Sequence, residues 1–284
     1  MPRHLVCISF DFDAMSGMIA RGLTTPTPVS RGEFGAVAVP RILALLRKYD
    51  VRTTWFIPGF TIETYPAQCA TVVEAGHEIA HHGWTHLPPN DMTREQEESG
   101  LVRANEAIKK LSGRHARGYR SPSWDLSPHS IELLLKYGFM YESSMMGDDY
   151  TPYRARRGDV VEIEKPMAFG APTPLIEMPI SWTLDDFPHF EFLRLKTSVT
   201  QGLMNAGLVA ENWINDFMYF RDNFDWGVLT YTFHPYVMGR GHRMIVLEKL
   251  LATLAGNGAQ FVTMEDAARE YDARAPFAGK GAQA

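Results

Sequence analysis

The sequence is poor in cysteine, in long apolar runs and in net positive charge. Its two cysteines, Cys7 and Cys69, are too few for a disulfide framework. No run approaches the roughly 18 apolar residues that a membrane-spanning helix requires, so we expect no membrane partner. The formal net charge of −5 argues against binding to nucleic acid or to an anionic membrane surface.

The N-terminal segment also lacks the features of a secretory signal. Its first residues, MPRHLVCISFDFD, place no long apolar stretch behind the basic residues, and charge arrives at Asp11. A signal peptide needs an apolar stretch of about 7–15 residues before its cleavage site. We therefore expect a cytoplasmic protein.

What the sequence does contain is enough apolar material for a core and a sustained alternation of strands and helices. Hydrophobic residues make up 45% of the 284-residue chain, which argues against wholesale disorder. Apolar, β-prone segments alternate with amphipathic helical patterns from end to end. The predicted strands cover residues 5–12, 53–57, 77–82, 117–120, 139–145, 175–182, 227–233 and 261–262.

This alternation predicts an α/β fold with a mostly parallel sheet. About seven parallel strands in one uninterrupted series favour a single-domain, distorted (β/α) barrel over two domains. The sequence shows no linker and no internal repeat, so residues 1–284 are predicted to form one domain with a frayed tail after about residue 272. Two stretches, 16–30 and 148–171, are predicted to be irregular loops.

Four polar clusters stand directly after predicted strands. They are Asp11-Phe12-Asp13, His82 to His86, Arg120 to Asp125, and His234-Pro235. Because the carboxyl ends of parallel strands meet on one face of a barrel, these clusters should lie together. Each cluster alone would be weak evidence, but their coincidence predicts a functional site.

The first cluster holds two carboxylates in an extended segment. Residues two apart point the same way from a strand, so Asp11 and Asp13 should face the same cleft. A lone carboxylate at a strand end is usually a helix cap or a solvated turn. Two carboxylates in one cleft repel each other unless a cation lies beside them. A metal ion would neutralise one and leave the other free to act as a base.

The second cluster supplies imidazoles at a spacing typical of metal ligands. His82 and His86 can turn toward one ion if the chain makes a helical turn after Gly83. His77 and His81 are expected to be surface or capped residues, with His81 on the opposite side of the strand from His82. One aspartate and two histidines leave coordination positions open, which suits a catalytic ion more than a structural one.

The remaining candidates lie at other strand ends. His234 is a candidate general acid, and a simple strand-terminating turn is the alternative reading. Arg120 is either a surface cation or a partner that holds Asp11 ionised. Trp124 and Trp182 are either core aromatics or walls of a pocket.

With these clusters in order, the chain resembles the polysaccharide deacetylase superfamily (NodB-like, carbohydrate esterase family 4). The resemblance runs from Ser9 to about His234, which is most of the chain. The family's motifs TFDDG, H-(S/T)-x-x-H after GHE, and R-x-P-x-(W/Y) correspond here to SFDFDA, GHEIAHHGWTH and RSPSW. Its final strand-end histidine corresponds to LTYTFHP.

The resemblance implies a NodB-like barrel and a role for each matching residue. Asp13, His82 and His86 would hold a divalent metal, expected to be zinc. Asp11 would be the base and Arg120 its orienting partner, and His234 would be the acid.

The sequence departs from the family pattern in places. Phe12 splits the family's adjacent aspartates, and Gly83 replaces the residue after the first histidine. The family's Asp-x-x-Asp-Trp motif, which orients the acid histidine, is absent in that form, and WTLDD at 182–186 lies in roughly its place. Trp124, Trp182 and Asp185 are expected in the substrate pocket. With SRGEFG at 30–35, these features resemble a branch that includes cytoplasmic peptidoglycan deacetylase-like, allantoinase-like and cyclic-imide hydrolases.

The resemblance implies a metal-dependent hydrolase that cleaves a carbon–nitrogen bond by N-deacetylation of an amino sugar or polysaccharide. A cyclic imide or ureide ring is the alternative substrate, so the partner is a small molecule or a saccharide. Two histidines and a carboxylate also describe a non-haem iron oxygenase, although those usually have all-β scaffolds. A barrel that only binds a ligand is a third reading. The stretches 16–30 and 148–171 could either fold over the site or dock a neighbouring subunit of a homo-oligomer.

Overall fold

The computed structural model describes residues 2–195 and 197–278 of the chain. Within these residues, one sheet of nine strands forms the centre of the molecule. The strands are β1 (Arg3–Asp11), β2 (Thr54–Ile57), β3 (Glu78–His81), β4 (Gly118–Tyr119), β5 (Tyr141–Glu142), β6 (Tyr153–Arg157), β7 (Ala171–Glu177), β8 (Trp226–Phe233) and β9 (Gln260–Phe261). Their spatial order is β6-β7-β5-β4-β3-β2-β1-β8, with β9 paired to β1. Every pairing is parallel except that of β6 with β7.

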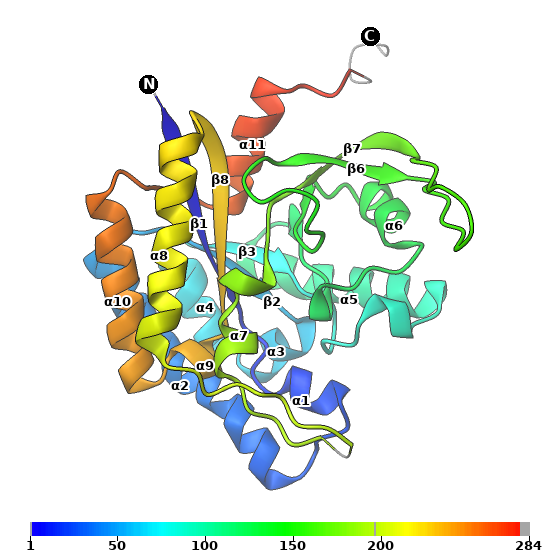
Figure 1. Ribbon diagram of the computed structural model, residues 1–284. Helices are drawn as coiled ribbons and strands as arrows, with labels where there is room; N and C mark the ends of the chain where they lie inside the picture. The colour runs from blue at the N-terminus through cyan, green and yellow to red at the C-terminus, as the bar shows by residue number, and fades with distance from the viewer. Residues whose placement is uncertain (1, 196, 279–284) are drawn as a thin grey trace.

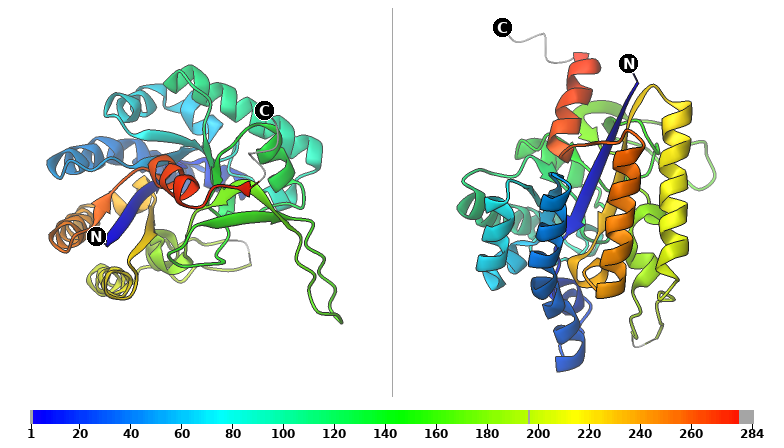
Figure 2. Two further views of the ribbon diagram at one scale, coloured as in Figure 1. Left: turned by 90° about the horizontal axis from the view of Figure 1, so that it is seen from above. Right: turned by 90° about the vertical axis from the view of Figure 1, so that its left-hand side faces the viewer.

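The sheet curls into part of a barrel, and helices surround its outside (Figure 2). The helices are α1 (Ser16–Ala20), α2 (Pro26–Lys48), α3 (Gly59–Thr64), α4 (Pro66–Glu74), α5 (Arg94–Ser112), α6 (Ser130–Lys136), α7 (Asp186–Phe190), α8 (Ala206–Asn223), α9 (Pro235–Met238), α10 (Gly241–Gly256) and α11 (Met264–Arg274). The predicted α/β class and distorted barrel are confirmed. In the described part of the chain, no helix has both the length and the apolar character needed to cross a membrane.

The pleat of the strands divides their side chains between two cores. In β1, Val6, Ile8 and Phe10 belong to the core between sheet and helices, whereas Leu5 and Cys7 belong to the core inside the curled sheet. Successive side chains of a strand point to opposite faces, so a fully buried strand must be apolar on both sides. This explains why the strand of residues 5–10 carries no charge.

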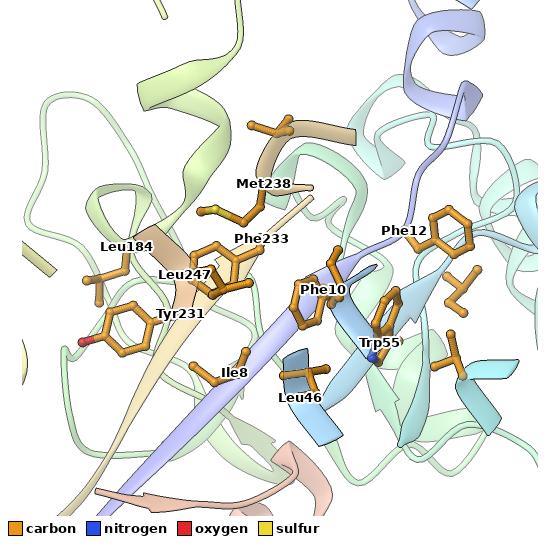
Figure 3. Packing of buried hydrophobic residues seen from close by; sticks show 14 of the residues in the cluster. Ile8, Phe10, Phe12, Leu46, Trp55, Leu184, Tyr231, Phe233, Met238 and Leu247 are labelled. Carbon is orange, nitrogen blue, oxygen red and sulfur yellow. The ribbon is translucent and has the colours of Figure 1, made fainter. Parts of the chain in front are cut away.

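The outer core fixes the central strands relative to each other (Figure 3). Phe10 of β1 stacks on Trp55 of β2 with ring centroids 4.6 Å apart, and its ring lies 5.8 Å from Phe233 of β8. Leu46 of α2 and Leu247 of α10 are fully buried in the same cluster. Burying each such side chain contributes about 1.5–3 kcal/mol, so the carboxyl ends of β1, β2 and β8 are held rigidly beside one another.

The structure corrects the two stretches that were predicted to be irregular. Residues 16–30 contain α1 and the start of α2, because the prolines near the start of α2 occupy its first turn, where a missing N–H is tolerated. Residues 148–171 contain β6, whose sequence YRARR is too charged to show a strand pattern. An edge strand tolerates such residues because one of its sides faces solvent.

The C-terminal helix runs slightly further than predicted. Helix α11 continues to Arg274, and the Arg154 guanidinium donates a hydrogen bond of 2.7 Å to the carbonyl of Ala275. The segment that follows residue 272 therefore keeps contact with β6. The last part of the predicted frayed tail, residues 279–284, lies outside the described residues.

Candidate active site

The four polar clusters meet at the carboxyl ends of the parallel strands. In Figure 1 the helices α1, α3, α7 and α9 gather around this end of β1 and β8. A pocket of about 430 Å³ opens there. It is lined by Asp11, Asp13, Arg21, His82, His86, Ser123, Trp124, Trp182, Asp185, Phe187 and His234.

The two aspartates reach the pocket because of the strand pleat. Asp11 is the last residue of β1, and Asp13 follows two residues later. Both carboxylates face the pocket, whereas the intervening Phe12 points away and packs edge-on against Trp55 in the outer core. Asp11 and Asp13 are only 1% and 3% exposed, so their charges must be compensated by protein groups or by a bound cation.

Arg120 compensates Asp11. Its Nη1 donates hydrogen bonds to Asp11 Oδ1 at 2.7 Å and to Ser9 Oγ at 2.9 Å. Its Nε donates to the carbonyl of Ser143 at 3.2 Å, and the guanidinium lies over the Phe56 ring. Burial alone would raise the pKa of Asp11, but the charges of Arg120, His82 and His234 and the hydrogen bond from Arg120 together outweigh it and hold that pKa below its usual value.

The two predicted ligand histidines converge on Asp13. His82 Nδ1 lies 2.8 Å from the carbonyl of Arg120, which can only accept, so this nitrogen carries a proton, and the lone pair of the neutral imidazole is then on Nε2. His82 Nε2 lies 3.4 Å from Asp13 Oδ1, and His86 Nε2 lies 3.3 Å from Asp13 Oδ2. The predicted helical turn between them is wrong. The chain instead turns through Gly83 at φ +70°, where an added Cβ would lie 2.8 Å from the Pro122 ring.

These three residues fit a metal ion. Asp13 Oδ1, His82 Nε2 and His86 Nδ1 are buried and have no hydrogen-bond partner among the described residues. One ligand atom from each residue lies within 4.8 Å of the others. Burial raises the pKa of Asp13 to about 6 and lowers that of His86 well below its usual value. Two imidazoles and a carboxylate form a donor set that suits a divalent cation such as zinc.

On the far side of Asp13, His234 pairs with Asp186. Its Nδ1 lies 2.8 Å from Asp186 Oδ1, and its backbone N–H donates to both oxygens of Asp186 at 3.0 Å. His234 Nε2 is left facing the pocket, 3.7 Å from Asp13 Oδ2. Burial opposes the charged imidazole, but Asp185, Asp186 and Asp13 raise the pKa of His234 well above its usual value.

Asp186 is the site residue that the sequence had left unresolved within WTLDD. Asp185 and Asp186 are adjacent, and their order alone does not show which one meets His234. Asp185 Oδ1 instead caps α7 by accepting a hydrogen bond of 2.7 Å from the backbone N–H of Phe187, and it lines the pocket. The Asp185–Asp186–His234 group could also be read as a metal site, but the hydrogen bonds to His234 already occupy Asp186.

Two tryptophans form one wall of the pocket. The rings of Trp124 and Trp182 stack with centroids 4.0 Å apart and an interplanar angle of 20°. Trp124 is 8% exposed and Trp182 is 39% exposed, so the wall runs from the interior to the surface. Both rings line the pocket. Of the two interpretations of the sequence, a pocket wall therefore describes them better than core packing.

Several residues in or beside the pocket have left-handed backbone conformations that only glycine adopts without strain. Ala14, His86, Ser123 and Trp124 have φ values between 50° and 57°. Such residues cost about 1–3 kcal/mol each and persist where the surrounding structure forces them. These residues are concentrated beside the aspartates and the tryptophan wall. The backbone strain is therefore tolerated where the side chains of the pocket are positioned.

Together the fold and the pocket define a class of protein, a barrel hydrolase with a buried Asp-His-His set between an aspartate–arginine pair and a histidine–aspartate pair. Comparison with known proteins agrees. Residues 27–141 match the Polysaccharide deacetylase family. The chain is 36% identical to a peptidoglycan deacetylase of Helicobacter pylori, over 96% of this chain and 97% of that protein. It is 30% identical to a peptidoglycan deacetylase-like protein of Gibberella zeae, over 95% and 86%.

Solved structures show the same fold. A protein from Mycobacterium smegmatis assigned to the polysaccharide deacetylases superposes with a TM-score of 0.84 at 30% identity, covering 96% of this chain and 91% of that one. PuuE allantoinase superposes with a TM-score of 0.78 at 20% identity, over 97% and 92%, a likeness of fold alone. The chain belongs to the polysaccharide deacetylase family and is a hydrolase of carbon–nitrogen bonds other than peptide bonds.

Proposed function

We propose that this protein is a zinc-dependent deacetylase that removes the N-acetyl group from an amino sugar within a saccharide of the peptidoglycan or chitin type. The observation that carries the proposal is the buried group of Asp13, His82 and His86, in which one ligand atom from each residue lies within 4.8 Å of the others, between Asp11 and His234. The peptidoglycan deacetylase relatives support the saccharide class. These relatives favour neither a cyclic imide substrate nor an oxygenase reaction.

Asp13, His82 and His86 would hold the ion. When bound, a divalent metal polarises an amide carbonyl and lowers the pKa of water toward about 7. The Arg120 carbonyl accepts a hydrogen bond from His82 Nδ1–H and so fixes the tautomer in which Nε2 can act as a metal ligand. The two oxygens of Asp13 face one imidazole each.

Asp11 is proposed as the general base. It has one oxygen bonded to Arg120, and the other lies 3.8 Å from His82 Nε2, beside the ligand set. Arg120 keeps the carboxylate ionised and oriented. In the first half of the reaction, Asp11 accepts a proton from water while the water oxygen bonds to the acetyl carbonyl carbon.

His234 is proposed as the general acid. Asp186 holds its Nδ1–H and stabilises the charged imidazolium, so the proton available to substrate is on Nε2, which faces the pocket. In the second half of the reaction the carbon–nitrogen bond breaks, and His234 donates that proton to the departing nitrogen. The products are acetate and a free amino sugar.

The tryptophan wall gives the proposal its saccharide specificity. Stacked indoles offer a flat apolar surface that reaches from the interior to solvent, and the apolar face of a pyranose ring packs on such a surface. Asp185 lies in the same pocket and supplies a hydrogen-bond acceptor near His234. A sugar seated on Trp124 and Trp182 would present its substituents to the buried cluster.

A substrate panel tests the proposal. The protein, stripped with a chelator and reloaded with zinc, is assayed for hydrolysis of N-acetylated chitooligosaccharides, peptidoglycan fragments, allantoin, succinimide and dihydrouracil. We expect acetate release from the N-acetylated saccharides, lost on chelation and restored by zinc. Hydrolysis of a cyclic substrate without any acetate release would contradict the deacetylase assignment, and full activity after chelation would contradict the metal.

A further inference from the structure

A second surface hollow, with a volume of about 760 Å³, lies where α10 begins. We call it the arginine hollow, because Arg31, Arg240 and Arg243 line it together with Glu191, Tyr236 and His242. It shares no lining residue with the catalytic pocket. Its charged groups take no part in the proposed reaction, so their gathering requires a separate explanation.

Arg243 is the part of the hollow that points most directly to a ligand. The side chain is buried, with the residue 8% exposed, and its terminal nitrogens donate to the carbonyls of Val237 at 2.9 Å and Phe190 at 3.3 Å. Its Nε–H is also buried, but it has no acceptor among the described residues. A buried charged donor without an acceptor is costly, and an anion in the hollow would supply one.

The start of α10 adds backbone donors to the same place. This helix has 16 residues, and Arg240 at its N-cap position provides no side-chain cap. Its first turn carries no acidic residue. The first N–H groups of a helix have no partner within the helix, and the helix dipole places partial positive charge on them. Uncapped donors beside two arginines form a favourable environment for an oxyanion.

The charges around the hollow do not balance without an anion. Glu191 is the carboxylate among the lining residues, and it forms an ion pair with Arg31. Arg240 lies over the Phe34 ring at 3.6 Å rather than beside a carboxylate. Asp186 also acts on Arg243, but its hydrogen bonds go to His234. Burial lowers the pKa of both Arg240 and Arg243, and the charge of Arg243 lowers that of Arg240 further, whereas Asp186 and Glu191 act on Arg243 in the opposite direction.

We infer that the arginine hollow binds a small dianionic oxyanion of the phosphate class, held by Arg240, Arg243 and the first N–H groups of α10. A phosphate group offers several acceptor oxygens in different directions, which matches donors that come from two side chains and a helix end. A carboxylate offers only two oxygens and one charge. This site is separate from the catalytic pocket and does not depend on the proposed deacetylation.

Isothermal titration with inorganic phosphate tests the inference on the zinc-loaded protein, against sodium chloride at matched ionic strength. We expect saturable binding of phosphate to the native chain, with affinity reduced about tenfold or more in Arg240→Gln. Arg47→Gln removes one positive charge from an exposed position on α2 and should bind phosphate as the native chain does. Arg240 is partly exposed, so its replacement leaves the core intact.

A second control separates the hollow from the metal site, since phosphate could also bind to zinc. Asp13→Ala should retain phosphate binding, because Asp13 is not part of the hollow. Loss of binding in Asp13→Ala would overturn the inference and place the anion at the metal. Equal losses in Arg47→Gln and Arg240→Gln would overturn it as well, and so would no binding beyond the sodium chloride control.

Discussion

Two clusters of buried acids lie at strand ends in this protein, and their neighbours differ. Asp11 and Asp13, which follow β1, lie beside Arg120 and three imidazoles. Glu142 and Glu177 end the neighbouring strands β5 and β7, where they are paired in register and both fully buried. The backbone N–H groups of Ser144 and Met145 donate to Glu177 at 3.0 and 2.8 Å.

The comparison shows that burial of acids does not by itself make a functional site. The glutamate pair resolves its repulsion by protonation, because burial and the charge of Glu142 raise the pKa of Glu177 well above its usual value. The aspartates instead face imidazole nitrogens whose lone pairs have no donor. A bound proton is enough to offset the repulsion in the glutamate pair. The aspartate–histidine cluster instead needs a cation to engage its unused lone pairs. Four variants test this contrast.

Asp13→Ala should have the largest effect. Removing the carboxylate leaves two imidazoles, which are too few ligands for stable retention of the ion. Bound zinc, measured by elemental analysis after dialysis, should fall to a small fraction of the native value, and deacetylation should fall to background. A variant that kept both full zinc and full activity would show that Asp13 is not a ligand.

Asp11→Asn should separate binding from catalysis. The amide cannot accept the proton from water, so turnover should fall by about 10²- to 10⁴-fold. Zinc content should stay near the native value, because the ligand set of Asp13, His82 and His86 is intact. If this variant turned over substrate as fast as the native enzyme, the base assignment would be wrong.

Asp186→Asn should have a smaller effect on turnover, of about tenfold, because His234 keeps its place but loses the charge that stabilises its imidazolium. The acids around His234 raise its pKa, so removing one lowers that pKa. Activity requires protonated His234, and the alkaline limb of the pH–rate profile should therefore move to lower pH. An unchanged profile with native zinc content would argue against His234 as the acid.

Glu177→Gln should have the smallest effect, and on stability alone. A carboxyl whose pKa is raised by folding stabilises the native state below its unfolded pKa of about 4.3, and that contribution is lost as pH rises. The glutamine has no proton to lose, so the variant should be more stable than the native chain at pH 8 by about 1 kcal/mol or more. Denaturant unfolding from pH 5 to 9 measures this difference.

The exposed Glu74 of α4 offers a matched control, since Glu74→Gln changes the same charge without burial. It should leave the pH dependence of unfolding as it is in the native chain. A pH dependence in Glu177→Gln that equals the native one would show that the glutamate pair does not share a proton. It would also remove the physical basis for the contrast with the aspartates.

The sequence predicted those features of the site that depend on local geometry. The two-residue period of a strand places Asp11 and Asp13 on one face with Phe12 on the other, and it separates His81 from His82 in the same way. His81 indeed packs outward, with Nε2 3.0 Å from the carbonyl of Leu101. The strand–helix alternation predicted a parallel barrel, and this brings the strand ends together.

Other features were beyond the sequence because they depend on distant contacts. His86 reaches Asp13 through a left-handed turn held against Pro122 and α3, and no spacing rule predicts that path. Arg21, which follows α1, and Phe187 of α7 line the pocket, and no motif marks them. The antiparallel β6 was missed because its charged sequence suits an edge and resembles a loop.

The sequence by itself determined the alternating pattern, the strand ends and the residue types that stand there, since these follow from the pleat and from side-chain chemistry within a few residues. Only the tertiary structure decided that Asp186 rather than Asp185 lies 2.8 Å from His234 Nδ1, and that a left-handed turn at Gly83 brings His86 to Asp13. Those choices depend on distances between segments far apart in the chain, and packing of the whole barrel sets such distances.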